Sequence, residues 1–223
     1  KFYQNRKVFL LTAEPYAIFM SECPYIDGVI IDKRLPRWNL FYLNNLKKIL
    51  ARYNFNKVFD LQNSSRTKFY KRFLIKNVEW SSTETTLEPG QKKSDFDKEP
   101  VLDRMEAQLK KSGIETEFVK NIDLSWAVED ISRLIRQYAN NEYILLFPFC
   151  SKKLQHKKWP YFKNLISKLK QDYKNKYPIL LAPGPNEINE ANELNGKVVL
   201  DNNEPINIKT LISLINGAKF IIS

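Results

Sequence analysis

The sequence has very little cysteine. Cys23 and Cys150, the two cysteines among 223 residues, lie far apart, which is neither a disulfide framework nor a metal-ligand pattern. We interpret both as reduced, buried thiols. The chain also lacks any apolar run near the roughly 20 residues needed to cross a bilayer, and residues 1–12 lack the apolar core and cleavage signal of a secretory peptide. We therefore expect a globular, cytoplasmic protein.

Acidic residues are too few to balance the basic ones. The chain has 36 Lys and Arg against 25 Asp and Glu, a formal net charge of +11. This excess of positive charge favours an anionic partner. Nucleic acid, an acidic membrane face and a phosphorylated substrate are the three alternatives. Because the lysines are spread through the chain rather than gathered in one tail, a solvated basic surface explains the charge equally well.

The first part of the chain alternates between short apolar runs and segments of helical period, the pattern of a parallel sheet with crossover helices. Strands are expected at 8–11, 29–31 and 57–61. Leu43, Leu46 and Leu50 recur at helical spacing and predict a helix over 39–53.

Residues 81–99 are polar, contain Gly and Pro, and have almost no apolar period. We expect a mobile loop there. Helices follow at 101–113 and at 125–138. The polar pair Asn140–Asn141 is the expected domain boundary, so that 1–140 forms the first domain and 141–223 the second.

The second domain repeats the alternation around the segment 143–160. An apolar strand at its start is followed by a loop, Pro148 to Trp159, and a helix is expected from Pro160. Later strands are expected at 179–182, 198–200 and 220–222, with helices from Glu187 and over 208–217. The fold class is therefore α/β, with two parallel-sheet units in tandem.

The loop before Trp159 is crowded with cations: Lys152, Lys153, Lys157 and Lys158, with Ser151 ahead of them. It leads into a helix whose first N–H groups lack partners, and such an end attracts anions. A diphosphate is one fitting ligand; a solvated lysine cluster remains the alternative.

Two further residues have open interpretations. His156, the single histidine, lies among lysines that disfavour its charged form, so that it is able to accept a proton, but a lone histidine in a basic loop is more often exposed and idle. Glu187 opens a helix after a strand end, where an acid accepts ribose hydroxyls or merely complements the helix dipole.

Several segments, taken in order, resemble the family 9 glycosyltransferases, the heptosyltransferases of lipopolysaccharide core assembly. In the second domain these are PFCSKKLQHKKWPYF, APGPNE before a helix, and NIKTLISLINGAKFIIS. In the first they are KVFDLQNSSRTKF and ECPYIDGVIIDKR. The resemblance covers nearly the whole chain, and the basic element before Trp-Pro is its most specific piece.

The resemblance implies a GT-B architecture, two Rossmann-like domains facing across a cleft. It implies heptose transfer from ADP-heptose to the phosphorylated lipid A and core acceptor, with inversion, at the inner membrane face, with no metal and no cofactor beyond the ADP-sugar donor. It assigns the donor phosphates to Lys157 and Ser151, the donor ribose to Glu187, and the acceptor side to Arg66.

The chain departs from the family pattern in two ways. Many relatives have His-Pro-Gly or Val-Pro-Gly where this chain has Phe147, Pro148 and Phe149, and without the glycine a close backbone approach to the diphosphate is harder. The family's catalytic aspartate would precede Lys1, and its Asp-x-Gly-x-x-His element would follow Ser223. We therefore expect a fragment that is inactive by itself and whose catalytic base is unknown.

Other functions remain open at this point. A GT-B enzyme with another sugar donor, or an epimerase, would share the fold and the cationic loop. A nucleic-acid-binding protein is favoured by the charge alone, and the sequence has no recognition helix, RNP-like segment or zinc motif. A non-catalytic relative is the third alternative. We expect no nucleic-acid partner.

Overall fold

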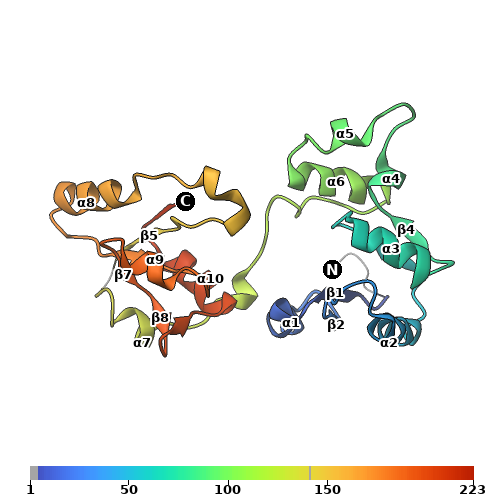
Figure 1. Ribbon diagram of the computed structural model, residues 1–223, viewed down its shortest axis with the longest axis horizontal. Coiled ribbons are helices and arrows are strands. Elements are labelled where there is room, and N and C mark those ends of the chain that lie inside the picture. Colours follow the sequence, from blue (N-terminus) through green and yellow to red (C-terminus); the bar gives the residue numbers. More distant parts are fainter. Residues whose placement is uncertain (1–4, 141) are drawn as a thin grey trace. The chain divides into compact units, whose positions relative to one another are not determined.

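The computed structural model describes residues 5–140 and 142–223 (Figure 1). Their contacts divide the chain into two compact units, Lys1–Asp123 and Leu124–Ser223, drawn in blue to green and in yellow to red. Within the described residues, every strand pair is parallel except the hairpin of β8 and β9. No helix in that part of the chain is long and apolar enough to cross a membrane.

The first unit alternates strands and helices as expected. Its first elements are β1 (Phe9–Ala13), α1 (Glu14–Ser21), β2 (Gly28–Asp32), α2 (Leu40–Ala51), β3 (Lys57–Phe59), α3 (Ser65–Phe73) and β4 (Glu79–Ser81). Strand β1 pairs with β2, placing Phe9 opposite Gly28, and β3 pairs with β4, placing Lys57 opposite Glu79. Because each pair is parallel, the carboxyl ends of its two strands lie at one edge.

Helix α2 supplies much of the first core. Its N-cap is Asn39, whose side chain accepts a hydrogen bond from the Tyr42 N–H at 2.9 Å. Leu43, Leu46 and Leu50 are buried against β2, α3 and β4. The helix predicted from their spacing is confirmed.

The prediction of a loop over 81–99 is wrong in part. Two short helices form there, α4 (Thr83–Thr86) and α5 (Lys93–Phe96), and Phe96 is buried. Helical period is undetectable in four-residue helices, so the polar composition concealed them. Helix α6 (Val101–Lys111) follows as predicted and ends before Gly113, whose φ of +76° favours glycine.

The second unit contains a four-stranded parallel sheet in the order β10-β5-β6-β7. Its elements are η1 (Ser125–Ala127), α7 (Ser132–Ile135), β5 (Ile144–Leu146), η2 (Lys152–Lys157), α8 (Phe162–Asp172), β6 (Ile179–Leu181), α9 (Ile188–Asn192), β7 (Lys197–Val198), β8 (Leu200–Asp201), β9 (Glu204–Pro205), α10 (Ile208–Gly217) and β10 (Phe220–Ile222). The central strands β5 and β6 are buried throughout, as their uniformly apolar sequences require.

The segment 124–140 differs from its prediction in two respects. It is not one helix over 125–138 but the 3₁₀ turn η1 and the single helical turn α7. It also packs with the second unit: Ile131, Leu134 and Ile135 lie against the core of that unit, and the Glu129 N–H donates to Ser213 Oγ at 2.8 Å. The compact units therefore divide after Asp123, whereas the sequence predicts the boundary after Asn140.

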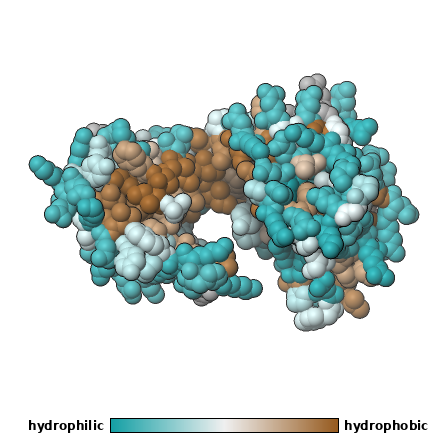
Figure 2. Space-filling view, turned by 90° about the horizontal axis from the view of Figure 1, so that it is seen from above, coloured by the Kyte–Doolittle hydropathy of each residue, from teal (hydrophilic) through white to brown (hydrophobic). Residues whose placement is uncertain are grey.

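Apolar side chains reach the surface of the second unit. Figure 2 shows a hydrophobic area on the unit drawn at the left. Strand β10 forms one edge of the four-stranded sheet, and its Phe220 and Ile221 are about half exposed.

Gln108 ties α6 to the carboxyl ends of β3 and β4. Its side chain is 1% exposed. Nε2 donates to the Asp60 and Ser81 carbonyls at 3.1 and 3.0 Å, and Oε1 accepts from Asn63 Nδ2 at 2.9 Å. A buried amide with both ends bonded keeps three polar groups satisfied.

Gln108→Leu is expected to destabilise the first unit by about 2–4 kcal/mol, because it leaves these buried groups without partners. Amide hydrogen exchange of β3 and β4 measures the loss. Asn45→Ala, a change of an exposed amide on α2, is the control and should leave exchange unchanged. Equal exchange in both variants would contradict the assigned role of Gln108.

Candidate functional site

The candidate donor site lies at the carboxyl ends of β5 and β6. These strands are parallel neighbours, with Leu146 opposite Leu181, so the segments that follow them leave the sheet at the same edge. We call this the β5–β6 edge; it comprises the loops 147–161 and 182–187. In an open α/β sheet, ligands bind at such an edge.

The first loop is braced by its own hydrogen bonds. Ser151 is the N-cap residue of η2, and its carbonyl accepts from the Leu154 N–H at 2.8 Å. Gln155 Nε2 donates to the Cys150 and Ser151 carbonyls, each at 3.4 Å. The predicted open loop is thus largely a 3₁₀ helix, and α8 begins at Phe162 rather than at Pro160.

Lys157 ends η2 and is exposed, and its side chain has no ion pair or hydrogen bond within the described part of the chain. The next residue, Lys158, is half-buried and pairs with Glu190 of α9. Trp159 then packs edge-on against Phe162, with ring centroids 5.3 Å apart. The two neighbours therefore hold the backbone beside Lys157, while its own ammonium stays available to an anion.

The remaining predicted features of this loop have weaker roles. Ser151 and His156 are exposed. Both cysteines are free thiols, and Cys23 is buried as predicted. Cys150 is only half-buried, with Sγ 3.3 Å from the Leu154 carbonyl, because it lies in the loop rather than in the sheet.

Glu187 shapes the second loop. It is the N-cap residue of α9, and its Oε2 accepts from the Gly184 N–H at 2.7 Å. A Cβ at position 184 would lie 3.2 Å from that oxygen, so glycine permits the close turn. Glu187 therefore has a structural bond on one oxygen, and the second oxygen remains available to a hydroxyl donor.

The structure thus brings Ser151, Lys157 and Glu187 to one edge of one sheet. The pair of Lys158 and Glu190 connects the first loop to α9, the helix that follows the second loop. This arrangement offers an exposed ammonium for phosphate oxygens and a carboxylate for hydroxyl groups.

Arg66 belongs to the first unit, and its guanidinium is engaged. Nη1 donates to Tyr70 Oη at 2.9 Å, and Nη2 donates to the Arg34 and Leu35 carbonyls at 3.2 and 3.0 Å. The bond to Tyr70 raises the pKa of Arg66. The observed bonds are structural: they hold the segment that follows β2 against α3.

Arg66 extends a buried polar network that sequence reasoning missed. Asp32, at the end of β2, is buried and accepts from the hydroxyls of Tyr42 and Tyr70, the latter at 2.7 Å. Burial and the bond to Asp32 raise the pKa of Tyr42, and burial is the main cause of the raised pKa of Tyr70. In the sequence, this network was indicated only by Asp32, a lone aspartate at the end of an apolar strand, and by Tyr42 on the apolar face of α2.

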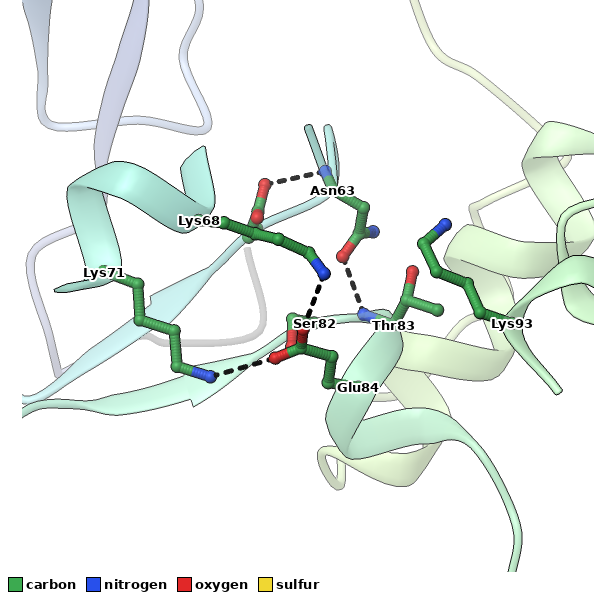
Figure 3. Close-up of a pocket in the computed structure, with 8 residues that line it drawn as sticks. Asn63, Lys68, Lys71, Ser82, Thr83, Glu84 and Lys93 are labelled. Atoms are coloured by element: carbon green, nitrogen blue, oxygen red, sulfur yellow. Dashed lines mark hydrogen bonds and ion pairs between the residues drawn. The ribbon is translucent and has the colours of Figure 1, made fainter. Parts of the chain in front are cut away.

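Figure 3 shows a small lysine-lined pocket in the first unit. Lys68 and Lys71 point at Glu84, at 2.6 and 3.6 Å from its carboxylate oxygens, and Asn63 Oδ1 accepts from the Thr83 N–H at 2.6 Å. The cavity volume is about 10 Å³, room for about one water molecule. Its lysines serve internal ion pairs rather than a ligand of any size.

A larger cavity, of about 290 Å³, lies beside it. The two share Asn63 and Thr83. One face of α6 contributes Val101, Arg104, Met105 and Gln108, which recur at helical spacing. We call it the α6 cavity. In the sequence, this cavity was indicated only by Arg104 and Gln108, two polar residues on the otherwise apolar stripe of α6.

The chain was compared with known proteins. No protein-family model matches it, and no curated protein matches it. Solved structures do match. The E. coli heptosyltransferase WaaC with ADP has a TM-score of 0.63 and 18% identity, with 98% of this chain and 71% of that chain covered.

Two further solved structures are similar to this chain at comparable TM-scores. The glycosyl transferase family 9 protein from Veillonella parvula DSM 2008 has a TM-score of 0.65 and 13% identity, over 97% of this chain and 66% of that one. E. coli ADP-heptose lps heptosyltransferase II has a TM-score of 0.60 and 14% identity, over 98% and 70%. The chain has the α/β fold of these GT-B glycosyltransferases, which confirms the fold class expected from the sequence.

The tyrosine pair around Asp32 predicts a loss of stability in alkali. Below about pH 10 both tyrosines are neutral in folded and unfolded chains. Above that pH the unfolded tyrosines ionise while the folded ones, whose pKa is raised, do not, so stability falls as pH rises. Tyr42→Phe should reduce this fall by up to about 1.4 kcal/mol per pH unit and cost about 1 kcal/mol at neutral pH.

Urea unfolding between about pH 8 and pH 11 measures both effects. Tyr16→Phe, on exposed helix α1, is the matched control and should change neither quantity. An unchanged alkaline slope in Tyr42→Phe would show that Tyr42 ionises in the folded protein.

Proposed function

We propose that this chain is part of a glycosyltransferase that transfers heptose from ADP-heptose onto the lipopolysaccharide inner core, with inversion. One observation carries the proposal: at the β5–β6 edge of a GT-B fold, the braced loop after β5 presents an exposed Lys157 whose side chain has no partner among the described residues, and the loop after β6 presents Glu187. The likeness to heptosyltransferases, one of them solved with ADP, supports the choice of donor.

The chemistry requires charge stabilisation at the leaving diphosphate. As the acceptor oxygen bonds to the anomeric carbon, its proton passes to a general base, the bond to the diphosphate breaks, and negative charge grows on the departing ADP. An ammonium at the position of Lys157 stabilises that charge more strongly in the transition state than in the ground state. Ser151 adds a hydroxyl donor, and Glu187 accepts from the ribose hydroxyls.

The acceptor side belongs to the first unit in this proposal. Arg66 was expected to meet the acceptor directly, but three of its hydrogen bonds are internal. We assign it the positioning of the segment 34–38. The catalytic base is not assigned to any residue of this chain.

Contact with the inner membrane face is the second component of the proposal. Trp38, Leu40 and Phe41, at the start of α2, are 80%, 75% and 86% exposed. Arg34 and Arg37 lie beside them in sequence and donate to uncharged partners, Gln62 Oε1 at 2.8 Å and the Ser65 carbonyl at 3.4 Å.

The charge of both arginines is therefore not cancelled by a carboxylate in these bonds. Aromatic side chains next to arginines suit the interface of an anionic bilayer. This surface supports a peripheral location at the cytoplasmic membrane face, where the first unit would lie close to a lipid-linked acceptor.

Lys157→Ala is expected to lower the affinity of the protein for ADP-heptose by about tenfold or more, because a charge-assisted bond to phosphate contributes about 1.5–3 kcal/mol. Titration calorimetry measures it. Lys153→Ala, an exposed lysine of the same 3₁₀ helix, is the matched control and should retain most of the affinity. Equal affinities in wild type and Lys157→Ala would refute the donor assignment.

The double change Trp38→Ser with Phe41→Ser is expected to lower binding to vesicles containing phosphatidylglycerol by tenfold or more, since each buried aromatic contributes about 2 kcal/mol. Cosedimentation measures it, with phosphatidylcholine vesicles as the charge control. Phe118→Ser, another exposed aromatic of the first unit, should have no effect. Undiminished binding of the double variant would place membrane contact elsewhere.

A further inference from the structure

Two Asn-Gly pairs lie in the second unit, in different backbone settings. Asn195–Gly196 occupies the turn between α9 and β7 (Figure 1), whereas Asn216–Gly217 forms the end of helix α10. Both asparagine side chains are exposed. Before a glycine, the following peptide nitrogen reaches the side-chain amide carbon of asparagine most easily, because glycine has no Cβ in the way. The two pairs therefore differ in their backbone and not in their residues.

Packing requires the glycine at position 196. A Cβ there would lie 2.8 Å from Leu181 Cδ1 and 3.3 Å from the Ile179 carbonyl oxygen, so the turn lies directly on β6. The Gly196 N–H donates to the Leu194 carbonyl at 2.6 Å, which closes a turn of only three residues. Gly217 is instead a helix residue, and the N–H of such a residue bonds to the carbonyl four residues earlier. The Gly196 peptide is therefore the more open of the two to solvent base.

An ammonium group contacts the same peptide unit. Lys170 of α8 is half-buried, and its Nζ donates to the Asn195 carbonyl oxygen. That oxygen belongs to the peptide bond whose nitrogen is Gly196 N. When this nitrogen loses its proton, resonance places much of the negative charge on the oxygen, where a charge-assisted hydrogen bond stabilises it. Lys170 therefore increases the fraction of the Gly196 nitrogen that is deprotonated and able to attack.

We propose that Asn195 is a site of spontaneous deamidation, which Lys170 accelerates. Solvent base removes the Gly196 N–H proton, and the nitrogen bonds to Asn195 Cγ. The bond from Cγ to Nδ2 breaks, and ammonia leaves with a proton from solvent. Water then opens the cyclic imide: cleavage at the side-chain carbonyl gives aspartate, and cleavage at the main-chain carbonyl gives isoaspartate. The reaction needs only solvent water, so it does not depend on the proposed function.

The isoaspartate product changes the backbone next to strand β7. This strand pairs with β6, with Leu181 opposite Val198, and the buried Val199 N–H donates to the Leu181 carbonyl at 2.8 Å. Isoaspartate adds a methylene group to the main chain directly before Gly196, where the turn already lies against Leu181. We expect this insertion to loosen β7 from β6. The aspartate product adds only a carboxylate, close to the ammonium of Lys170.

The experiment incubates the 223-residue chain near neutral pH and follows both Asn-Gly pairs by peptide mass spectrometry, with an isoaspartyl methyltransferase to detect isoaspartate. Asn195 is expected to react at least about tenfold faster than Asn216, because Gly217 must first leave its helix. The same chain unfolded in guanidinium chloride is the reference. There the two pairs should react at similar rates, and Asn195 should react more slowly than in the folded chain, because the bond to Lys170 is lost.

Lys170→Met should slow the deamidation of Asn195 by about tenfold, because it removes a charge-assisted bond to the attacking anion. Lys170→Arg keeps a cationic donor and should keep most of the rate. Lys168→Met, a change of an exposed lysine on the same helix, is the matched control and should leave the rate unchanged. A raised rate at Asn216 would reveal a variant that fails to fold, and the comparison of folded with unfolded wild type then decides.

Amide hydrogen exchange measures the effect on β7. Exchange of the Val199 N–H should quicken in the isoaspartate form and stay unchanged in Asn195→Asp, which has the charge without the added methylene. Unchanged exchange in the isoaspartate form would refute the effect on β7. Three results would overturn the role of Lys170: equal rates at Asn195 and Asn216 in the folded chain, no acceleration of Asn195 by folding, or an unchanged rate in folded Lys170→Met.

Discussion

Parallel strand pairing is the constraint on which the rest of this structure depends. It sends the segments after β2, β3, β4, β5 and β6 out through the carboxyl edges of their sheets. Backbone groups there no longer have ladder partners, and the chain fills the gap with buried side chains. Asp32, Asp60 and Gln108 do so in the first unit, and the half-buried Glu187 bonds the Gly184 N–H in the second.

This requirement separates cations that maintain the fold from cations that remain available. Arg66 donates to two carbonyls and a hydroxyl, and Lys158 pairs with Glu190. Lys157 makes neither kind of bond within the described chain, and Arg104 makes only one of its possible bonds to a side chain. Position in the sequence does not distinguish these residues, since each is a basic residue next to a strand end or a cavity. The partners do.

The fold was largely predictable from the sequence because, in the longer elements, the regularly spaced apolar residues are the ones that pack into the core. Leu43, Leu46 and Leu50 predicted α2, and the apolar run before Pro148 predicted β5. Short elements were not predictable: the residues 125–138 have helical period, yet only single turns form, since Ile131 and Leu134 face the core of the second unit. Long-range contacts decide to which compact unit these residues belong, and the hydrophobic period of a segment does not encode such contacts.

The candidate site was predictable only in part, for the same reason. Glu187 was proposed from its position after a strand end, whereas Lys157 was distinguished from its neighbouring lysines only by the family resemblance. The role of Arg66 was missed because its partners, the Arg34 and Leu35 carbonyls, lie more than thirty residues away in the chain. The α6 cavity joins residues of the segment after β3, of α4, of α5 and of α6, and in the sequence it was indicated only by an arginine and a glutamine on the apolar stripe of α6.

The ion pair between Lys158 and Glu190 joins the first loop of the β5–β6 edge to α9, the helix that follows the second loop. Under the proposed donor assignment, an ADP that contacts both loops would order them together, so part of the entropy of immobilising them would be lost once rather than twice. The phosphate and ribose halves of the nucleotide would then bind cooperatively.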